Sequence, residues 1–286
     1  MKFGELEIFV VSDGRFRLDG GAMFGVVPKP LWQRRLAADD RNRITLALNC
    51  LLIRSAGRTI LVETGTGEKF DSKGQDIYGI EHNVTLLASL QRCGVAPEEV
   101  DIVVNTHLHF DHCGWNTRWG KNGKPVPTFP RARYYVQRGE YEHAQRPTER
   151  DRASYLPENF EPLAATNQWV WLEGEAEIAP GVELIRVPGH TRDMQCVRLR
   201  AGERTAFFFA DLVPTTAHLS YPWIMGYDLY PLTTLENKKR WIPEAVHNDW
   251  LCFFPHDPEV PAAYLRERDG TVVAEPVEEQ ELITPQ

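Results

Sequence analysis

Apolar and polar residues alternate with a period of two along several short stretches of this chain. Such alternation predicts β-strands that bury one face. Near the N-terminus the pattern predicts strands at 5–11 and 46–54, and a hairpin partner for the second strand at 59–63. Further strands are predicted at 100–104, 132–136, 182–187, 194–199, 205–210 and 250–254.

Helical periodicity is limited to three segments. Over 83–93, Leu86, Leu87 and Leu90 share one face, Asn83 is the expected N-cap and Gly94 is expected to end the helix. A short helix is predicted over 139–145. A third is predicted over 235–245, with Leu235 and Trp241 pointing inward.

The remaining long segments lack either period. The segment 19–45 contains Met23, Phe24, Leu31 and Trp32, and is too long and too apolar for a simple connector. It is expected either to pack as a flap on the body of the protein or to cover a site or a partner subunit, which leaves a homodimer open. The segments 115–133 and 147–168 are expected to be loops. No internal repeat or linker divides the chain, so one domain over 1–286 is predicted.

Composition excludes some classes of function. The 286 residues carry 32 basic and 40 acidic side chains, a net charge of −8, and no basic block, so nucleic acid is not an expected partner. No apolar stretch approaches the length of a membrane span, and the N-terminus has no signal-peptide pattern. The five cysteines are scattered without pairing motifs, which is typical of reduced thiols in a cytoplasmic protein.

Four residues of metal-binding type follow the predicted strand 100–104. The segment Asn105-Thr-His-Leu-His-Phe-Asp-His112 places His107, His109, Asp111 and His112 within six residues. In an extended chain His107 and His109 share a face, and the turn toward Gly114 brings Asp111 and His112 to the other side of the same point. Imidazole and carboxylate groups are ligands for zinc and similar ions. The spacing therefore predicts two adjacent metal sites.

Three further predicted strands also end in such a residue: His190 within Pro-Gly-His-Thr, Asp211 after an apolar run, and His256. Asp211 could instead cap a helix, and Asp257 could point inward in place of His256. Cys113 is expected to fill space beside the site and not to bind metal. The other histidines, His82, His143, His218 and His247, are expected at the surface or behind the site.

These strand ends make the chain resemble the metallo-β-lactamase superfamily of metal-dependent hydrolases. The matching residues run from His107 to His256, and the strand pairs on either side fit the same family, so the resemblance covers nearly the whole chain. It implies an α/β fold, a four-layer αββα sandwich in which two mixed β-sheets lie face to face with helices outside.

The resemblance also implies a ligand set. His107, His109 and His190 would hold one ion, Asp111, His112 and His256 would hold the second, and Asp211 would bridge the two. Zinc is expected in both sites, with manganese, iron and cobalt as alternatives. A hydroxide between the two metals would attack the substrate, with Asp111 and Asp211 as the catalytic carboxylates.

The segment 212–230 indicates which class of substrate the protein would bind. Its Tyr221, Trp223 and Tyr227, with Phe24 and Trp32, are predicted to line an apolar substrate pocket, although each could equally be core packing. Such a pocket suits a hydrophobic ester, lactone or phosphotriester.

Within the superfamily, Asp211-Leu-Val-Pro-Thr and the later Trp-Ile-Met-Gly-Tyr-Asp are most similar to the quorum-quenching N-acyl homoserine lactonases, and next to the methyl-parathion-hydrolase-like branch. Lactone opening is therefore the expected activity. The alternatives are phosphotriester or aryl-ester hydrolysis, and a non-catalytic metal-binding scaffold. Some of these lactonases have a tyrosine three residues after the bridging aspartate, where this chain has Pro214. An assisting tyrosine would have to be Tyr221 or Tyr227.

Overall fold

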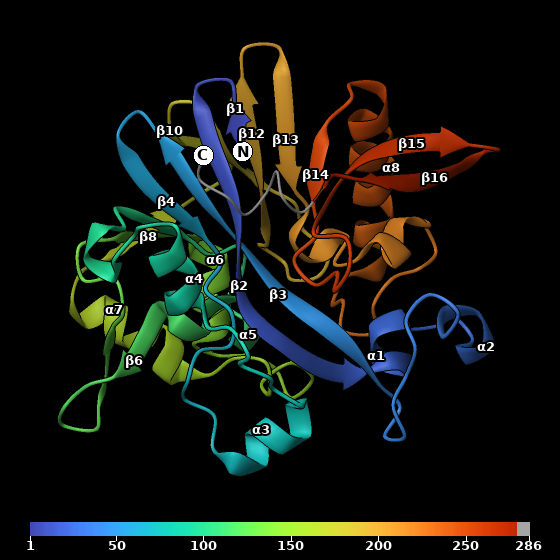
Figure 1. Cartoon of the computed structure of the whole chain (residues 1–286). Helices are drawn as coiled ribbons and strands as arrows, with labels where there is room; N and C mark the ends of the chain where they lie inside the picture. The colour runs from blue at the N-terminus through green and yellow to red at the C-terminus, as the bar shows by residue number, and fades with distance from the viewer. Residues whose placement is uncertain (279–286) are drawn as a thin grey trace.

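Two seven-stranded β-sheets lie face to face in the computed structural model, which describes residues 1–278 (Figure 1). The first sheet has the order β1-β2-β3-β4-β5-β8-β9 and the second runs from β10 to β16 in sequence order. Strands of the first sheet are β1 (Lys2–Phe3), β2 (Leu6–Asp19), β3 (Arg43–Ser55), β4 (Arg58–Val62), β5 (Ile102–Val104), β8 (Arg133–Gln137) and β9 (Trp169–Leu172). Strands of the second are β10 (Ala176–Ala179), β11 (Val182–Arg186), β12 (Gln195–Ala201), β13 (Arg204–Phe208), β14 (Leu251–Phe253), β15 (Ala262–Arg268) and β16 (Thr271–Pro276).

Both sheets are mixed. In the first sheet, β4, β5, β8 and β9 pair in parallel and the remaining pairs are antiparallel. In the second, only the β13–β14 pair of the described strands is parallel. Because side chains alternate along a strand, β2 contributes residues to two hydrophobic cores. Ile8 and Val10 enter the core between the sheets, whereas Phe9 and Val11 enter the core under the outer helices.

Helices cover the outer faces. The core on the outside of the first sheet includes residues of α4 (Leu86–Arg92), α6 (Arg138–Ala144) and α7 (Glu161–Ala165). Helix α8 (Pro231–His247) packs on the second sheet, where the Trp241 ring stacks on Phe207 at 5.2 Å. The predicted αββα sandwich is therefore confirmed. The other α-helices are α1 (Gly20–Phe24), α2 (Lys29–Trp32), α3 (Ser72–Tyr78) and α5 (Phe110–Cys113).

Several predicted boundaries are wrong. The strands predicted at 5–11 and 46–54 continue as a long hairpin that pairs as far as Asp19 and Arg43. Helix α4 begins at Leu86 with Thr85 as its N-cap, not Asn83, because the Thr85 side chain accepts a hydrogen bond from the backbone N–H of Ala88. The third helix spans 17 residues and not the 11 of 235–245, with Trp241 buried and Leu235 half-buried.

Some segments expected to be loops contain regular structure. The segment 115–133 contains the hairpin β6 (Thr117–Trp119) and β7 (Pro125–Pro127), and 147–168 contains α7. The end of the strand predicted at 205–210 is wrong, because Ala210 adopts a positive φ of 49° and begins a 3₁₀ turn. This turn carries Asp211 out of the sheet.

The segment 20–42 packs on the body of the protein. Met23, Phe24 and Trp32 are buried with Ile44 and Leu46 of β3 in a third hydrophobic core. Figure 1 shows α1 and α2 beside the far end of the β2–β3 hairpin.

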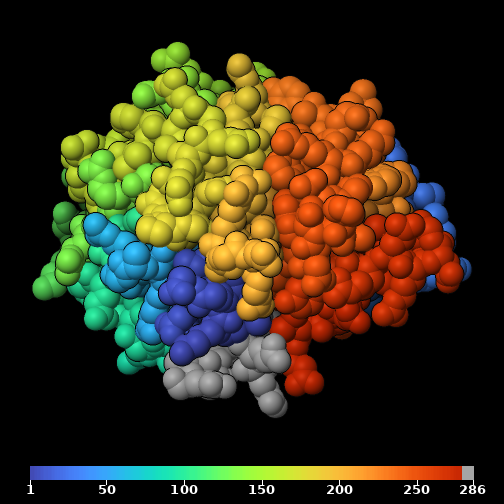
Figure 2. All heavy atoms as spheres, turned by 90° about the horizontal axis from the view of Figure 1, so that it is seen from above, coloured from blue at the N-terminus to red at the C-terminus, as the bar shows by residue number. Residues whose placement is uncertain are grey.

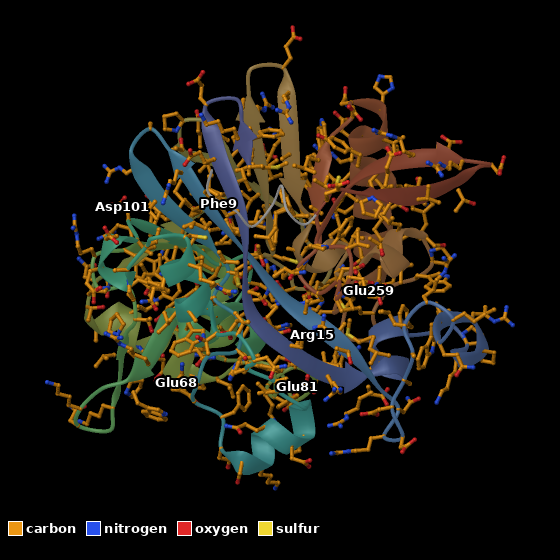
Figure 3. All side chains as sticks on the ribbon, in the orientation of Figure 1. Phe9, Arg15, Glu68, Glu81, Asp101 and Glu259 are labelled. Atoms are coloured by element: carbon orange, nitrogen blue, oxygen red, sulfur yellow. The ribbon has the colours of Figure 1, made fainter. Side chains whose placement is uncertain are left out.

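Segments far apart in sequence hold the two sheets together. Seen from above, the N-terminal residues lie against the yellow and orange strands of the second sheet (Figure 2), where the Arg204 guanidinium lies 4.2 Å from the centre of the Phe3 ring. Farther along β2, Arg15 donates to the backbone oxygen of Pro258, next to Glu259 (Figure 3). Among residues 1–278, no helix has the length and apolar character needed to cross a membrane.

Candidate metal centre

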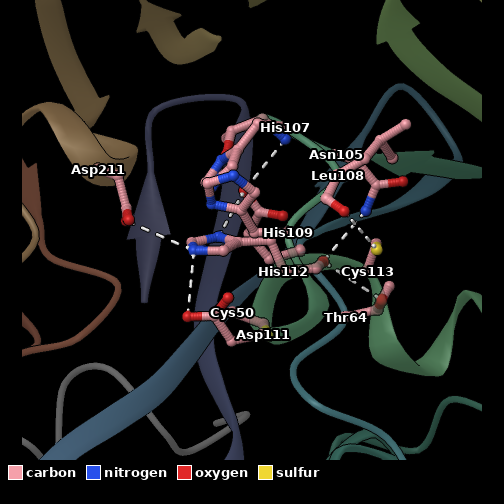
Figure 4. A network of polar contacts seen from close by, with 12 residues as sticks. Cys50, Thr64, Asn105, His107, Leu108, His109, Asp111, His112, Cys113 and Asp211 are labelled. Atoms are coloured by element: carbon pink, nitrogen blue, oxygen red, sulfur yellow. Dashed lines mark hydrogen bonds and ion pairs between the residues drawn. The ribbon is translucent and has the colours of Figure 1, made fainter. Parts of the chain in front are cut away.

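The seven predicted ligand residues meet at one end of the two sheets. His107 and His109 follow β5, and Asp111 and His112 lie in α5. His190 follows β11, Asp211 lies in the 3₁₀ turn after β13, and His256 follows β14. All seven side chains are buried. Figure 4 shows His112 in contact with both Asp211 and Asp111, with His107 and His109 beside it.

Two groups that share no residue have donor atoms within 4.8 Å of one another: His107, His109 and His190, and Asp111, His112 and His256. A third such group, His107, His112 and Asp211, lies between them. In the first group, His190 Nε2 lies 3.0 Å from His109 Nδ1. In the second, His256 Nε2 lies 3.1 Å from His112 Nε2. Nitrogen ligands bound at about 2.0–2.1 Å around a tetrahedral zinc lie about 3.3 Å apart. Each group therefore has the dimensions of a metal site.

Asp211 faces both groups. Its Oδ2 atom lies 3.3 Å from His190 Nε2 in the first group. Its Oδ1 atom lies 3.4 Å from His112 Nε2 and 3.2 Å from His256 Nε2 in the second. One carboxylate with an oxygen toward each group has the geometry of a bridging ligand.

Several buried polar atoms at this point have no hydrogen-bond partner among the described residues. They include Nε2 of His107, Nε2 of His109 and Oδ1 of Asp211. Burying a polar group without a partner costs about 1–3 kcal/mol, so such atoms are rare in folded proteins. Divalent cations would satisfy Nε2 of His107 and Oδ1 of Asp211, whereas His109 faces His190 with its other ring nitrogen, Nδ1. The donor set, imidazole and carboxylate, is also one that zinc prefers.

The electrostatics of the cluster separate the histidines into two kinds. Burial, reinforced by the neighbouring imidazoles, lowers the pKa of His107 and of His109 well below the usual range. Burial also acts to lower the pKa of His112, but Asp111, Asp211 and Glu63 outweigh it and raise this pKa well above 6.5. The histidines outweigh the effect of burial on Asp211, whose pKa lies well below its usual range. His107 and His109 are thus neutral and Asp211 is ionised, as metal binding requires, whereas His112 has to release a proton before its ring can bind a metal.

Two of the candidate ligand histidines are oriented by hydrogen bonds from one ring nitrogen. His256 Nδ1 lies 2.9 Å from the backbone oxygen of Ala47, which can only accept, so Nδ1 carries the proton and Nε2 presents its lone pair. His190 Nδ1 likewise donates to Asp228 Oδ1 at 2.9 Å, and Asp228 Oδ2 accepts from the Thr234 hydroxyl at 2.6 Å. Such partners fix the tautomer and ring orientation of metal-binding histidines.

Gly189 allows this arrangement at His190. A Cβ atom at Gly189 would lie 2.4 Å from the Thr234 hydroxyl oxygen. Any larger residue would therefore push apart the turn that carries His190 and the start of α8, which holds Asp228 through Thr234.

The loop after β4 supports the turn that carries His112. Thr64 N–H and the Asn105 side-chain amide both donate to the backbone oxygen of His112, at 2.8 and 3.1 Å (Figure 4). Glu63 Oε1 accepts from Thr106 N–H and lies 3.5 Å from His112 Nδ1. These supports were not predicted, since Glu63 lies more than 40 positions before the motif and has no local signature.

A cavity of about 440 Å³ opens onto the cluster. Its polar end is formed by His109, Asp111, His190, Asp211 and His256. Its other walls are mainly apolar: Leu18, Ala22, Met23, Tyr78, Phe110, Met225, Tyr227 and Leu229. Arg150, Asp151, Ala153 and Ser154 come from the segment expected to be a loop at 147–168. The cavity therefore joins a charged, buried centre to an apolar pocket.

Of the five aromatic residues predicted to line the pocket, only Tyr227 lines this cavity. Phe24 and Trp32 stack on each other at 5.4 Å behind its wall, and Trp223 packs edge-on against Phe24. Trp223 and Tyr221 line a separate groove. The cavity wall near α1 is instead Met23, whose backbone oxygen accepts a hydrogen bond from His218.

The open alternatives at the strand ends are decided by hydrogen bonds. Asp257 turns away from the cluster and accepts from the backbone N–H groups of Thr216, Glu259 and Val260. His256 is therefore the residue that faces the site. The Cys113 thiol donates to the backbone oxygen of Leu108 and belongs to neither group of candidate ligands.

Of the histidines outside the predicted ligand set, His218 is buried. Its ring forms hydrogen bonds with the backbone oxygen of Met23 and with the Thr215 hydroxyl. His143 pairs with the cavity-lining Asp151. His82 hydrogen-bonds to Thr66, and His247 lies exposed near the end of α8.

Comparison with known proteins agrees with this geometry. Residues 44–256 match the model of the metallo-beta-lactamase superfamily. An N-acyl homoserine lactonase of Bacillus cereus is 27% identical over 234 residues, which cover 76% of this chain and 84% of that protein. A crystal structure from Staphylococcus aureus, described as a probable metal-dependent hydrolase, is 29% identical with a TM-score of 0.89, covering 97% of this chain and 99% of that chain. The dizinc quorum-quenching lactonase AidC shares the fold at a TM-score of 0.80 and 20% identity, covering 97% of this chain and 96% of that chain.

Proposed function

Because the chain belongs to the metallo-beta-lactamase superfamily, we propose that it is a metal-dependent hydrolase that opens lactone rings of the N-acyl homoserine lactone type. The observation that carries the proposal is the position of Asp211, whose two oxygens face two groups of candidate ligands at the end of an apolar cavity. The similarity to the Bacillus cereus lactonase over 76% of the chain supports the choice of substrate.

The proposed cofactors are two divalent ions, with zinc expected first and manganese, iron or cobalt as alternatives. His107, His109 and His190 would hold one ion, Asp111, His112 and His256 the other, and Asp211 both. When bound, such ions lower the pKa of water to about 7 and polarise an ester carbonyl. No serine or cysteine nucleophile is then required.

Asp111 is the carboxylate proposed to handle the proton of the leaving group. Its Oδ2 atom lies 3.6 Å from His256 Nε2 and 3.7 Å from His112 Nε2, and the residue also lines the cavity. Opening a lactone leaves an alkoxide on the same molecule as the new carboxylate. Asp111 is placed between the cluster and the cavity, where it can pass a proton to that alkoxide.

The cavity favours a substrate with an apolar chain. Met23, Phe110 and Met225 provide an apolar wall beside the polar end. An acyl chain could bury there while the lactone ring meets the cluster. Methionine side chains adapt to irregular apolar groups, which suits acyl chains of more than one length.

The Tyr227 hydroxyl is proposed to assist the reaction in the absence of a tyrosine at Pro214. Burial raises the pKa of Tyr227 to about 12, so its phenol stays protonated and can donate a hydrogen bond to the substrate. We expect Tyr227→Phe to lower kcat for lactone opening by roughly 10-fold to 100-fold, as for the loss of one donor to a developing negative charge. Steady-state kinetics on the purified variant measure this. The matched control is Tyr221→Phe, which changes a tyrosine outside the cavity and should leave kcat unchanged. Equal kcat values in all three proteins would rule out assistance by Tyr227.

A substrate panel on metal-quantified protein tests the proposed substrate class. The panel contains acyl-homoserine lactones, simple γ- and δ-lactones, aryl esters and methyl paraoxon. Lactone opening with kcat/KM of about 10⁴ M⁻¹s⁻¹ or more is the expected result. Fast phosphotriester cleavage with negligible lactone opening would overturn the substrate class and favour the organophosphate alternative.

The cytoplasm is the proposed compartment, and the observation that supports it is the set of cysteines. All five are buried and unpaired. Free thiols persist in reducing compartments. A homodimer stays a prediction, for which Val26 and Leu31 of the 19–45 segment are the exposed apolar candidates.

A further inference from the structure

A buried carboxylate outside the predicted ligand set joins the two loops that carry the first group of ligands. Glu140 lies in α6 and its side chain is 1% exposed. Its Oε1 atom accepts from the backbone N–H of Leu108 at 3.0 Å, and its Oε2 atom accepts from the Thr191 hydroxyl at 2.6 Å. Leu108 stands between His107 and His109, and Thr191 follows His190.

Tyr155 connects Glu140 to His109, a member of the same group of candidate ligands. The Tyr155 hydroxyl donates to Glu140 Oε1 at 3.0 Å. The Tyr155 ring lies edge-on to His109 with the ring centres 4.8 Å apart. One carboxylate therefore accepts three hydrogen bonds, and each comes from a residue adjacent to, or packed on, a member of the group His107, His109 and His190.

The second group is held by different residues. The backbone oxygen of His112 accepts from Thr64 and Asn105, and His256 donates to the backbone oxygen of Ala47. Glu140 has no hydrogen bond with Asp111, His112 or His256 among the described contacts. The hydrogen bonds of Glu140 thus reach residues beside the first group and not the second.

We propose that Glu140 is a positioning residue that sets the affinity of the first metal site, formed by His107, His109 and His190, and leaves the second site unaffected. The inference rests on the proposed function, since it requires two metal ions. A carboxylate that accepts three hydrogen bonds holds the His107–His109 turn and the His190 turn at a fixed separation. Loss of such outer partners typically costs 10-fold to 100-fold in metal affinity.

The test counts metal ions, independently of activity. Metal-free wild-type protein and variants are titrated with Zn²⁺, and bound zinc per chain is measured after equilibrium dialysis at fixed free zinc. Wild type is expected to bind two ions. In Glu140→Ala, one ion is expected to bind 10-fold to 100-fold more weakly while the other keeps the wild-type affinity. Glu140→Gln should fall between, because its amide oxygen can still accept from Leu108 and Tyr155.

Two gentler variants keep the test decisive if Glu140→Ala fails to fold. Thr191→Val and Tyr155→Phe each remove one hydroxyl and one hydrogen bond to Glu140, and each should weaken the same single ion by a smaller factor. The control is Gln168→Leu, a buried residue whose side chain contacts Phe129, Pro130, Ala132 and Thr166. It should lose stability and keep both zinc affinities.

The results distinguish a wrong role for Glu140 from a wrong dinuclear centre. Equal weakening of both ions in the Glu140, Thr191 and Tyr155 variants, unchanged affinities in them, or the same selective loss in Gln168→Leu would overturn the role of Glu140. Wild-type protein that binds fewer than two ions would instead overturn the dinuclear centre of the proposed function.

Discussion

Replacing Asp211 by alanine is expected to lower kcat/KM for lactone opening by roughly 10³-fold or more. The physical reason is that Asp211 faces both groups, with Oδ2 3.3 Å from His190 and Oδ1 3.2 Å from His256. Without it the cluster loses the negative charge that its buried histidines surround. Kinetics and bound metal per chain, measured on the same preparation, test this prediction.

The matched control for Asp211 is Asp193→Asn. Asp193 lies close to His190 in the sequence, but its carboxylate pairs with Arg186 at 2.6 Å and belongs to neither group of candidate ligands. This variant should keep nearly full activity. His109→Ala should behave like Asp211→Ala, because it removes a member of the first group. Full activity in either site variant would contradict the dinuclear assignment.

Replacing Asp228 by asparagine is expected to lower metal affinity or kcat/KM by roughly 10-fold to 100-fold. Asp228 accepts from His190 Nδ1 on one oxygen and from the Thr234 hydroxyl on the other. An asparagine has one acceptor oxygen, which can still accept from His190 while its amide donates to the Thr234 hydroxyl, but the negative charge beside His190 is lost. The His190 ring is then a less basic metal ligand.

Thr234→Val separates the two hydrogen bonds of Asp228. It removes the hydroxyl that fixes Asp228 and leaves the contact with His190, so its effect on kcat/KM should be clearly smaller. Zinc affinity and kcat/KM are compared in the two variants. Equal losses would indicate that Asp228 acts through the start of α8 and not through His190.

The sequence predicted that the candidate ligands would lie together, because the information is local. His107, His109, Asp111 and His112 lie in one short motif, and His190, Asp211 and His256 each follow an apolar strand. Strands of stacked sheets that end at the same edge bring such residues together. The structure adds that all seven are buried and that Asp211 faces both groups.

The pocket wall could not be predicted in the same way, because it depends on how the segment 20–42 folds back. Phe24 and Trp32 stack on one another and become core, while Met23 turns toward the cavity. Nothing in the local pattern distinguishes Met23 from its neighbours. The supporting carboxylates Asp228 and Glu140 were missed for the related reason that each lies about 30–40 positions from the ligand loop it supports and belongs to no motif.

One missed element did have a local signal. The hairpin of β15 and β16 turns at Asp269-Gly270, and both residues have positive φ, at 51° and 71°. Asp-Gly between two alternating stretches is a strong hairpin signal, because both central residues of the tight turn need positive φ. The start of helix α4 is a similar case. Threonine, like the predicted Asn83, is a preferred N-cap residue, so Thr85 also had a local signal.

Lactone opening by this protein is proposed to require two metal ions bound at the cluster. The most direct measurement is a zinc titration of the metal-free protein in which bound zinc per chain and the rate of acyl-homoserine lactone opening are followed together. We expect no turnover without metal and full turnover when two ions are bound per chain. Turnover that persists in the metal-free protein, or a fully loaded protein with two ions and no lactone opening, would contradict this proposal.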